Sequence, residues 1–148
     1  MKVLEINGGK PLTGTIRISG AKNASVALIP AAILADSEVT ICNVPEITDT
    51  DALTEILEYL GATVKRASES VLISPTTIEN KEIPKELSTK LRASYYFMAA
   101  LLGKYKRAEV PLPGGCNIGS RPIDQHLKGF RALGAKVDIL HGAIVAEA

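Results

Sequence analysis

The sequence predicts an α/β (α+β) fold in which a unit of helix, strand, helix, strand and strand occurs twice. Three observations lead to this prediction: stretches of the chain resemble one another, apolar residues change from helical to alternating spacing, and glycines stand where helices should end. The chain has 148 residues, of which 46% are hydrophobic. That is long enough to bury one sizeable core, so we expect a single domain.

The repeat is visible in two pairs of segments. AAILADSEVTICNVP (31–45) matches AALLGKYKRAEVPLP (99–113) at a spacing of 68 residues, and DALTEILEYLGA (51–62) matches DQHLKGFRALGA (124–135) at a spacing of 73. The second copy therefore has five extra residues between Pro113 and Asp124, in the loop GGCNIGSR. Because loops on a rigid scaffold often carry functional residues, this loop is the first place to look for a site.

The two helices of each unit differ in pattern. The first is apolar around nearly its whole circumference, which is typical of a helix buried on all sides. The second is amphipathic and is followed by Gly61 or Gly134, which suit a helix C-terminus. The expected helices are 22–35, 50–60, 91–103 and 123–133, and the expected strands are 38–43, 63–66, 71–74, 108–112, 136–140 and 143–146.

We also expect an opening strand pair, 3–6 with 14–18, before the first unit. The chain then divides into three parts: the opening strand pair (1–18), repeat unit 1 (19–75) and repeat unit 2 with the cysteine loop (76–148).

Composition excludes several classes of function. The formal net charge of +1, the 4% aromatic content and the absence of Trp argue against a nucleic-acid surface. The longest apolar run, 24–35, is too short to span a membrane, and the N-terminus has no signal-peptide core. Cys42 and Cys116 form neither a disulfide framework nor a zinc pattern, and His126 and His141 have no ligand spacing with them. We expect a soluble, cytoplasmic protein without metal or cofactor.

Cations stand at corresponding helix starts in the two units. SGAKNAS (19–25) contains Lys22 and Asn23, and STKLRAS (88–94) contains Lys90 and Arg92. A helix N-terminus already has a partial positive charge, so a further cation is unfavourable there unless an anion lies opposite. Each cation alone is equally well explained as a solvated surface residue. Their recurrence favours an anion-binding site.

The loop PLPGGCNIGSRPID (111–124) has features of a ligand site. Gly114 and Gly115 allow the backbone to approach a ligand, and Arg121 can bind phosphate or carboxylate through two hydrogen bonds. Cys116, close to Arg121 in sequence, is in a setting that favours a reactive thiol, although a surface thiol without a role is the alternative. By contrast, Cys42 in the strand TICNV is expected to be a small buried residue.

Three separated motifs resemble one known family. SGAKNA (19–24), LRAS (91–94) and LPGGCNIGSRPID (112–124), the last followed by HLKGFRALGA, closely resemble the UDP-N-acetylglucosamine 1-carboxyvinyltransferases, which are enolpyruvyl transferases of peptidoglycan synthesis. The resemblance covers essentially the whole chain. It implies two domains, each an inside-out α/β barrel of three repeated units with helices inside. It also implies transfer of the enolpyruvyl group of phosphoenolpyruvate to the 3′-hydroxyl of UDP-N-acetylglucosamine, with release of phosphate.

The resemblance also implies roles for individual residues. Lys22 and Asn23 match residues that contact phosphoenolpyruvate and the sugar, and Arg92 matches an arginine that contacts UDP-N-acetylglucosamine. Cys116 matches a loop cysteine that donates a proton, adds covalently to phosphoenolpyruvate and is alkylated by fosfomycin. The segment that matches the contacts to the nucleotide consists of Arg121, Pro122, Ile123, Asp124 and Gln125.

The family pattern is incomplete here. The chain has roughly two of the six units, and no residue matches the deprotonating aspartate of the facing domain, so we expect an N-terminal fragment with half a site and no turnover alone. One alternative is the shikimate-pathway enolpyruvyl transferase, which lacks the loop cysteine. Others are a non-catalytic module that binds nucleotide sugars or anions, and a thiol-redox sensor, which the lack of a nearby second cysteine disfavours.

Overall fold

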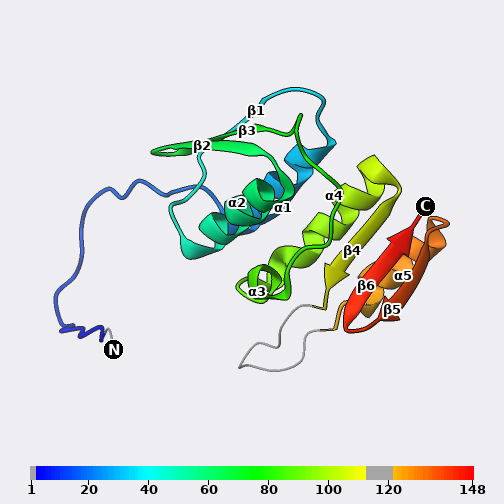
Figure 1. Ribbon diagram of the computed structural model, residues 1–148. Helices are drawn as coiled ribbons and strands as arrows, with labels where there is room; N and C mark the ends of the chain where they lie inside the picture. The colour runs from blue at the N-terminus through cyan, green and yellow to red at the C-terminus, as the bar shows by residue number, and fades with distance from the viewer. Residues whose placement is uncertain (1–2, 113–121) are drawn as a thin grey trace.

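The structure, a computed structural model, describes residues 3–112 and 122–148 (Figure 1). The first unit consists of α1 (Lys22–Ala31) with the 3₁₀ turn η1 (Ala32–Leu34), β1 (Val39–Cys42), α2 (Thr48–Leu60), β2 (Thr63–Ala67) and β3 (Ser70–Ser74). The second consists of α3 (Lys85–Ser88), η2 (Arg92–Tyr95), α4 (Tyr96–Tyr105), β4 (Arg107–Pro111), α5 (Asp124–Ala132), β5 (Lys136–Leu140) and β6 (Ala143–Glu147). The predicted order of helices and strands is confirmed in both units, with α3 as an addition that the pattern does not predict.

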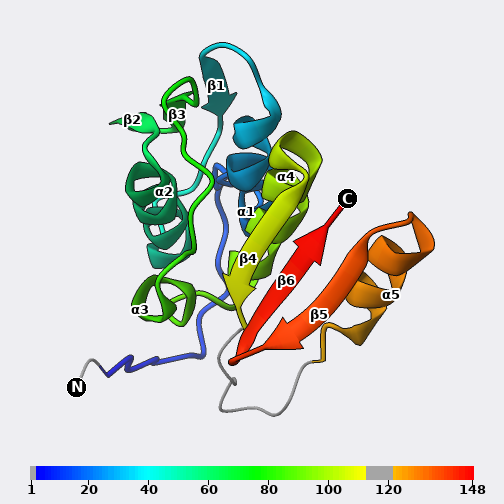
Figure 2. The same ribbon diagram turned by 45° about the vertical axis from the view of Figure 1, so that its right-hand side comes forward.

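Each unit forms one antiparallel sheet of three strands with its last strand in the middle. The strand orders are β1-β3-β2 and β4-β6-β5. Ile41 lies opposite Val71 in the first sheet, and Val110 lies opposite Ile144 in the second. Helix α5 packs against β5 at the edge of the second sheet (Figure 2). The equal strand orders agree with the internal repeat of the sequence.

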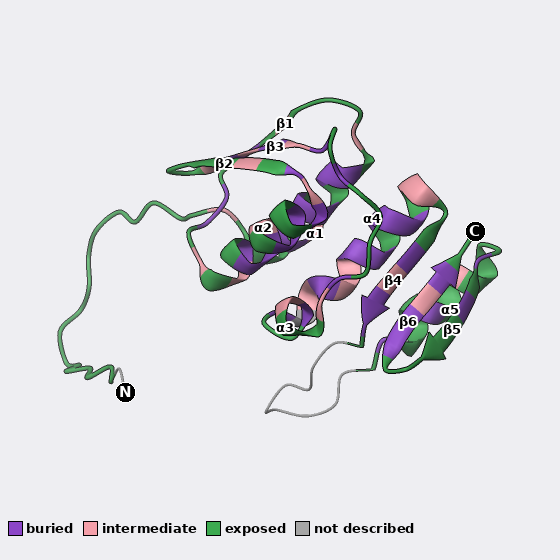
Figure 3. Ribbon diagram, in the orientation of Figure 1, coloured by how far each residue is buried: buried purple, intermediate pink, exposed green. Residues whose placement is uncertain are grey.

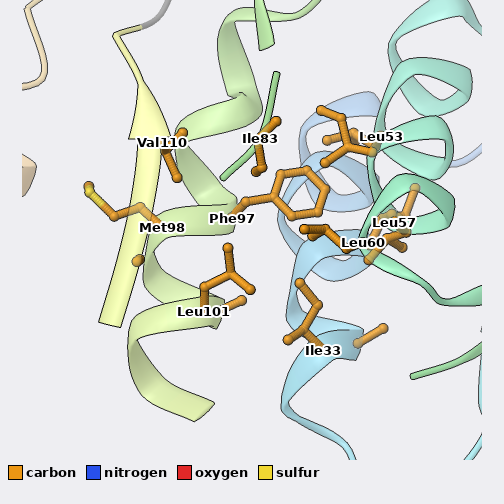
Figure 4. Close-up of a cluster of buried hydrophobic side chains, with 14 of the residues drawn as sticks. Ile33, Leu53, Leu57, Leu60, Ile83, Phe97, Met98, Leu101 and Val110 are labelled. Carbon is orange, nitrogen blue, oxygen red and sulfur yellow. The ribbon is translucent and has the colours of Figure 1, made fainter. Parts of the chain in front are cut away.

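One hydrophobic core runs through both units. Helix α1 packs against α2 and α4, and α4 packs against β4. The fully buried ring of Phe97, on α4, points toward α2 near Leu53 and Leu60 (Figure 4). Met98 extends from the other side of α4 toward β4, which carries the buried Val110. The buried residues in Figure 3 follow these facing surfaces, so the second unit covers part of the first.

Polar contacts supplement this packing, and one of them connects the two units. Within the second unit, the Tyr105 hydroxyl donates a hydrogen bond to the Ile78 carbonyl at 3.0 Å, and burial raises the pKa of this phenol. The Lys104 ammonium donates to the Ala35 carbonyl at 2.6 Å. Within the described residues, no helix has the length and apolar character that crossing a membrane requires.

The predicted opening strand pair is wrong. Residues 3–21 form neither helix nor strand; the first part of the segment extends away from the two sheets (Figure 1), and it reaches the first sheet where Arg17 forms an ion pair with Glu69 in the turn between β2 and β3. Its large apolar residues are strongly exposed: Val3, Leu4, Ile6, Leu12, Ile16 and Ile18. A strand requires a neighbouring strand to satisfy its backbone hydrogen bonds, and no strand in the described chain pairs with this segment.

The prediction that the first helix of each unit is buried on all sides is wrong for α1. Leu28 is 51% exposed and Leu34 in η1 is 52% exposed, with Ala31 exposed between them. The reason is that α2 and α4 cover only two faces of this helix. In α4, the predicted core residues Phe97, Met98, Leu101 and Leu102 are all buried.

Candidate functional site

A surface pocket of about 530 Å³ joins the two cation-bearing helix starts. The N-terminal turn of α1 lies on one side, and the segment that leads into α4 lies on the other. The pocket is lined by Lys22, Asn23, Val26, Asp49, Lys90, Leu91, Ala93, Tyr95 and Tyr96. Segments that are about 70 residues apart in the sequence therefore line one pocket.

Gly20 determines how the SGAKNA segment enters this pocket. A Cβ atom on Gly20 would lie 1.6 Å from the carbonyl oxygen of Asn43, so only glycine fits this crossing of two backbones. Helix α1 begins two residues later at Lys22, after an extended Ala21. The close crossing places the start of α1 near the loop that leads into α2.

The Lys22 ammonium forms an ion pair with the Asp49 carboxylate. Asp49 is in the first turn of α2, where the helix dipole favours a negative charge. The Lys22 side chain is 55% exposed and that of Asp49 is 24% exposed. A carboxylate partner for this cation is therefore present in the chain itself, and the Lys22 side chain, which lines the pocket, stays about half exposed.

The second cation of the pocket also has a carboxylate partner. Lys90 donates to both oxygens of Glu55, at 2.7 and 2.8 Å, and Glu55 is on α2 as well. One helix thus supplies the partners of both lysines. Both side chains of this second pair are about half exposed, so it is an ordinary surface ion pair.

An aromatic cluster connects the pocket with α5. The rings of Tyr95 and Tyr96 are stacked, with centroids 4.7 Å apart, and the Tyr95 ring lies 4.8 Å from that of His126. His126 is in the first turns of α5, so this contact brings the predicted nucleotide-binding segment close to the pocket.

The predicted residues of that segment are placed as follows. Ile123 is buried, whereas Pro122, Asp124 and Gln125 are exposed. The Gln125 amide donates to the Asp124 carboxylate at 3.1 Å. None of these four is among the described residues that line the pocket.

Other predicted site residues cannot be placed in the same way. Cys116 and Arg121 lie outside the described residues, as does the side chain of Arg92. The neighbours of Arg92, Leu91 and Ala93, line the pocket. The described part of the chain contains no group of three His, Cys, Asp or Glu that could hold a metal ion.

The prediction that Cys42 is buried is wrong, because this thiol is exposed. Burial alternates along β1, and Ile41 occupies the buried position. Cys42 is on the opposite face with Thr40, since successive side chains of a strand point to opposite sides.

The sequence reasoning missed Asp49 and the two tyrosines. The expected start of the second helix at residue 50 left Asp49 outside the helix, whereas α2 begins at Thr48. An acidic residue in a first helical turn was the available signal. Nothing in the spacing of Tyr95 and Tyr96 distinguishes them from core residues.

A family model described as EPSP synthase (3-phosphoshikimate 1-carboxyvinyltransferase) matches residues 6–148. The chain belongs to the EPSP synthase family. Within this family it is 52% identical over all 148 residues to UDP-N-acetylglucosamine 1-carboxyvinyltransferase 3 of Caldanaerobacter subterraneus subsp. tengcongensis, and covers 36% of that protein. It is 55% identical over 148 residues to UDP-N-acetylglucosamine 1-carboxyvinyltransferase 2 of Oceanobacillus iheyensis, and covers 35% of it. The chain thus spans about a third of these relatives.

Two solved structures confirm the predicted α/β fold. The enolpyruvyl transferase NikO from Streptomyces tendae superimposes with a TM-score of 0.76 at 26% identity, over 95% of this chain and 31% of NikO. EPSP synthase from Acinetobacter baumannii superimposes with a TM-score of 0.62 at 14% identity, over 90% of this chain and 32% of that protein. The second likeness is evidence for the fold alone.

Proposed function

We propose that this chain is the N-terminal part of a UDP-N-acetylglucosamine 1-carboxyvinyltransferase and contributes half of its active site. The complete enzyme transfers the enolpyruvyl group of phosphoenolpyruvate to the 3′-hydroxyl of UDP-N-acetylglucosamine and releases phosphate, in the cytoplasm, for peptidoglycan synthesis. The observation that carries the proposal is the pocket in which Lys22 and Asn23 meet the residues on either side of Arg92. Through peptidoglycan the reaction serves cell shape and cell division.

The residues of the site suit this chemistry. Phosphoenolpyruvate is an anion, and the exposed half of Lys22 offers it a charged hydrogen-bond donor. Arg92 and the segment from Arg121 to Gln125 bind UDP-N-acetylglucosamine, with α5 held near the pocket through His126 and Tyr95. Cys116 gives a proton to the methylene carbon of phosphoenolpyruvate while the sugar hydroxyl attacks the adjacent carbon, and is the thiol that fosfomycin alkylates.

Two alternatives make different predictions. A shikimate-pathway transferase would accept shikimate 3-phosphate, and the description of the family model includes that reaction. The relatives at 52–55% identity favour the nucleotide sugar instead. A non-catalytic module would bind UDP-N-acetylglucosamine without turnover even when the remaining part of the enzyme is supplied.

A hybrid protein tests the proposal. Residues 1–148 replace the matching third of the Caldanaerobacter relative, and phosphate release is measured with phosphoenolpyruvate and each acceptor. We expect turnover with UDP-N-acetylglucosamine, inhibition by fosfomycin, and loss of turnover in Cys116→Ala but not in Cys42→Ala. The 148-residue chain alone should not turn over, because it supplies only part of the enclosure that the reaction requires.

Turnover of the hybrid with shikimate 3-phosphate would contradict the proposed acceptor. Full activity of Cys116→Ala would contradict the assignment of the proton donor. Steady phosphate release by the 148-residue chain would contradict the need for the second half of the site.

A further inference from the structure

We propose that Asp49 is a positioning residue that holds the Lys22 ammonium where the phosphoenolpyruvate anion binds. This inference rests on the proposed function, because it names a residue of the same pocket. A free lysine side chain samples many rotamers along its four-carbon stem, which reduces the fraction of molecules with the charge correctly placed. The ion pair between Lys22 and Asp49, both in the pocket lining, restricts this freedom.

Asp49 can fulfil this role because the first turn of α2 is itself fixed. The neighbouring Thr50 is fully buried, and its hydroxyl donates to the Pro45 carbonyl at 2.9 Å. The Arg66 guanidinium, from β2, donates to the Pro45 carbonyl and to the Thr50 hydroxyl oxygen, both at 2.9 Å. Arg66 also forms an ion pair with Asp51. The turn that carries Asp49 is therefore tied to the first sheet.

If Asp49 acted only through its negative charge, it would weaken the binding of phosphoenolpyruvate, whereas a positioning residue strengthens it. A carboxylate beside an anion site repels the anion, so removal of its charge would strengthen binding of phosphoenolpyruvate. If Asp49 instead holds Lys22 in place, its removal weakens binding and turnover. The sign of the effect of Asp49→Asn therefore distinguishes positioning from simple charge.

The experiment is a double-mutant cycle in the hybrid enzyme. Asp49→Asn, Lys22→Ala and the double variant are compared with the parent by kcat/KM and by the Kd for phosphoenolpyruvate from calorimetry. Circular dichroism confirms that each variant is folded. Glu58→Gln, which removes the same charge from an exposed position of α2, is the matched control, and Asp49→Glu tests rescue by a longer carboxylate.

We expect Asp49→Asn to lower kcat/KM about tenfold and to weaken phosphoenolpyruvate binding, as for loss of one charged hydrogen bond. The double variant should be no worse than Lys22→Ala, because the two residues act as a unit. Asp49→Glu should recover most of the loss, and Glu58→Gln should stay within about twofold of the parent.

Other results overturn the inference. Tighter binding in Asp49→Asn, additive losses in the double variant, or an equal loss in Glu58→Gln would each show that Asp49 does not act through Lys22. A parent hybrid that binds phosphoenolpyruvate but does not turn over contradicts the proposed function alone, and the cycle in Kd still decides the role of Asp49. A parent hybrid that neither binds phosphoenolpyruvate nor turns over contradicts both the proposed function and the role of Asp49.

Discussion

Gly20 is the residue whose identity the structure explains most directly. Its Cα faces the backbone of Asn43 so closely that a Cβ atom would lie 1.6 Å from the carbonyl oxygen. A backbone oxygen cannot move aside as the end of a side chain can. The glycine of the SGAKNA motif is therefore a packing requirement that places the start of α1 with Lys22.

Gly20→Ala should destabilise the chain by at least about 2 kcal/mol, because the two backbones must separate to admit the methyl group. Gly129→Ala is the matched control, since Gly129 is in α5 and has open space around it. Alanine has the higher helix propensity, so this change should stabilise by about 0.5–1 kcal/mol. Urea denaturation followed by circular dichroism measures both. Equal effects of the two substitutions would refute the role of the close contact.

Single residues also differ in whether the sequence alone could predict their place in the structure. The recurrence of cations at two helix starts predicted an anion site, and Lys22 and the neighbours of Arg92 line one pocket, whereas binding of an anion there stays a prediction. The exposure of Cys42 depends on which face of β1 is covered, and this is determined by segments distant in the sequence. Asp49 could be found only after the start of α2 was known to within two residues.

At the scale of elements, the start of α2 is stabilised by an arginine from another element. Arg66 on β2 donates to the Pro45 carbonyl and the Thr50 hydroxyl, and pairs with Asp51 in the first turn. The residue before α2, Ile47, has no side chain that could cap the helix. Arg66 therefore ties the loop before α2 to the first turn of the helix, although a guanidinium, which only donates, leaves the free N–H groups of that turn to other acceptors.

Arg66→Gln should lower the free energy of unfolding by about 1–2 kcal/mol, because the buried Thr50 hydroxyl and the Pro45 carbonyl each lose a charged donor. Arg107→Gln is the control: Arg107 pairs with Glu109 and Glu147 on the exposed face of the second sheet, where such pairs contribute about 0–1 kcal/mol. Both are measured by urea denaturation. If Arg107→Gln lowers the free energy of unfolding as much as Arg66→Gln does, the hydrogen bonds of Arg66 at the start of α2 contribute no more than an exposed ion pair.

Elements whose partners lie in the same unit were predicted within a few residues. Strands β2, β3, β5 and β6 each pair with a neighbour in the same sheet, and hydrophobic alternation plus a tight turn was sufficient to find them. Residues 3–6 and 14–18 show comparable apolar content but no pairing. Sequence pattern indicates that a segment is suited to a strand, whereas formation of the strand depends on a partner.

At the scale of the whole molecule, the two repeats are packed differently although they are built alike. Leu60 at the end of α2 has 0% exposure and lies near Phe97 of the second unit (Figure 4). Its repeat counterpart, Leu133 after α5, is 87% exposed. The second unit covers the first in this way. An apolar surface also stays exposed at Leu28 of α1 and Leu34 of η1. Stacked repeats bury such faces against their neighbours.

If the chain belongs to the longer enzyme proposed above, we expect the remaining part of that enzyme to cover Leu133 as the second unit covers Leu60. In the 148-residue chain, Leu60→Ala should cost about 2–5 kcal/mol and Leu133→Ala less than about 0.5 kcal/mol, because only the first creates a cavity. In the hybrid enzyme, both substitutions should lower the melting temperature, since both leucines are then buried. Urea denaturation of the chain and thermal denaturation of the hybrid provide the comparison. If Leu133→Ala leaves the melting temperature of the hybrid unchanged while Leu60→Ala lowers it, the part of the hybrid that follows residue 148 does not pack on the second unit as the second unit packs on the first.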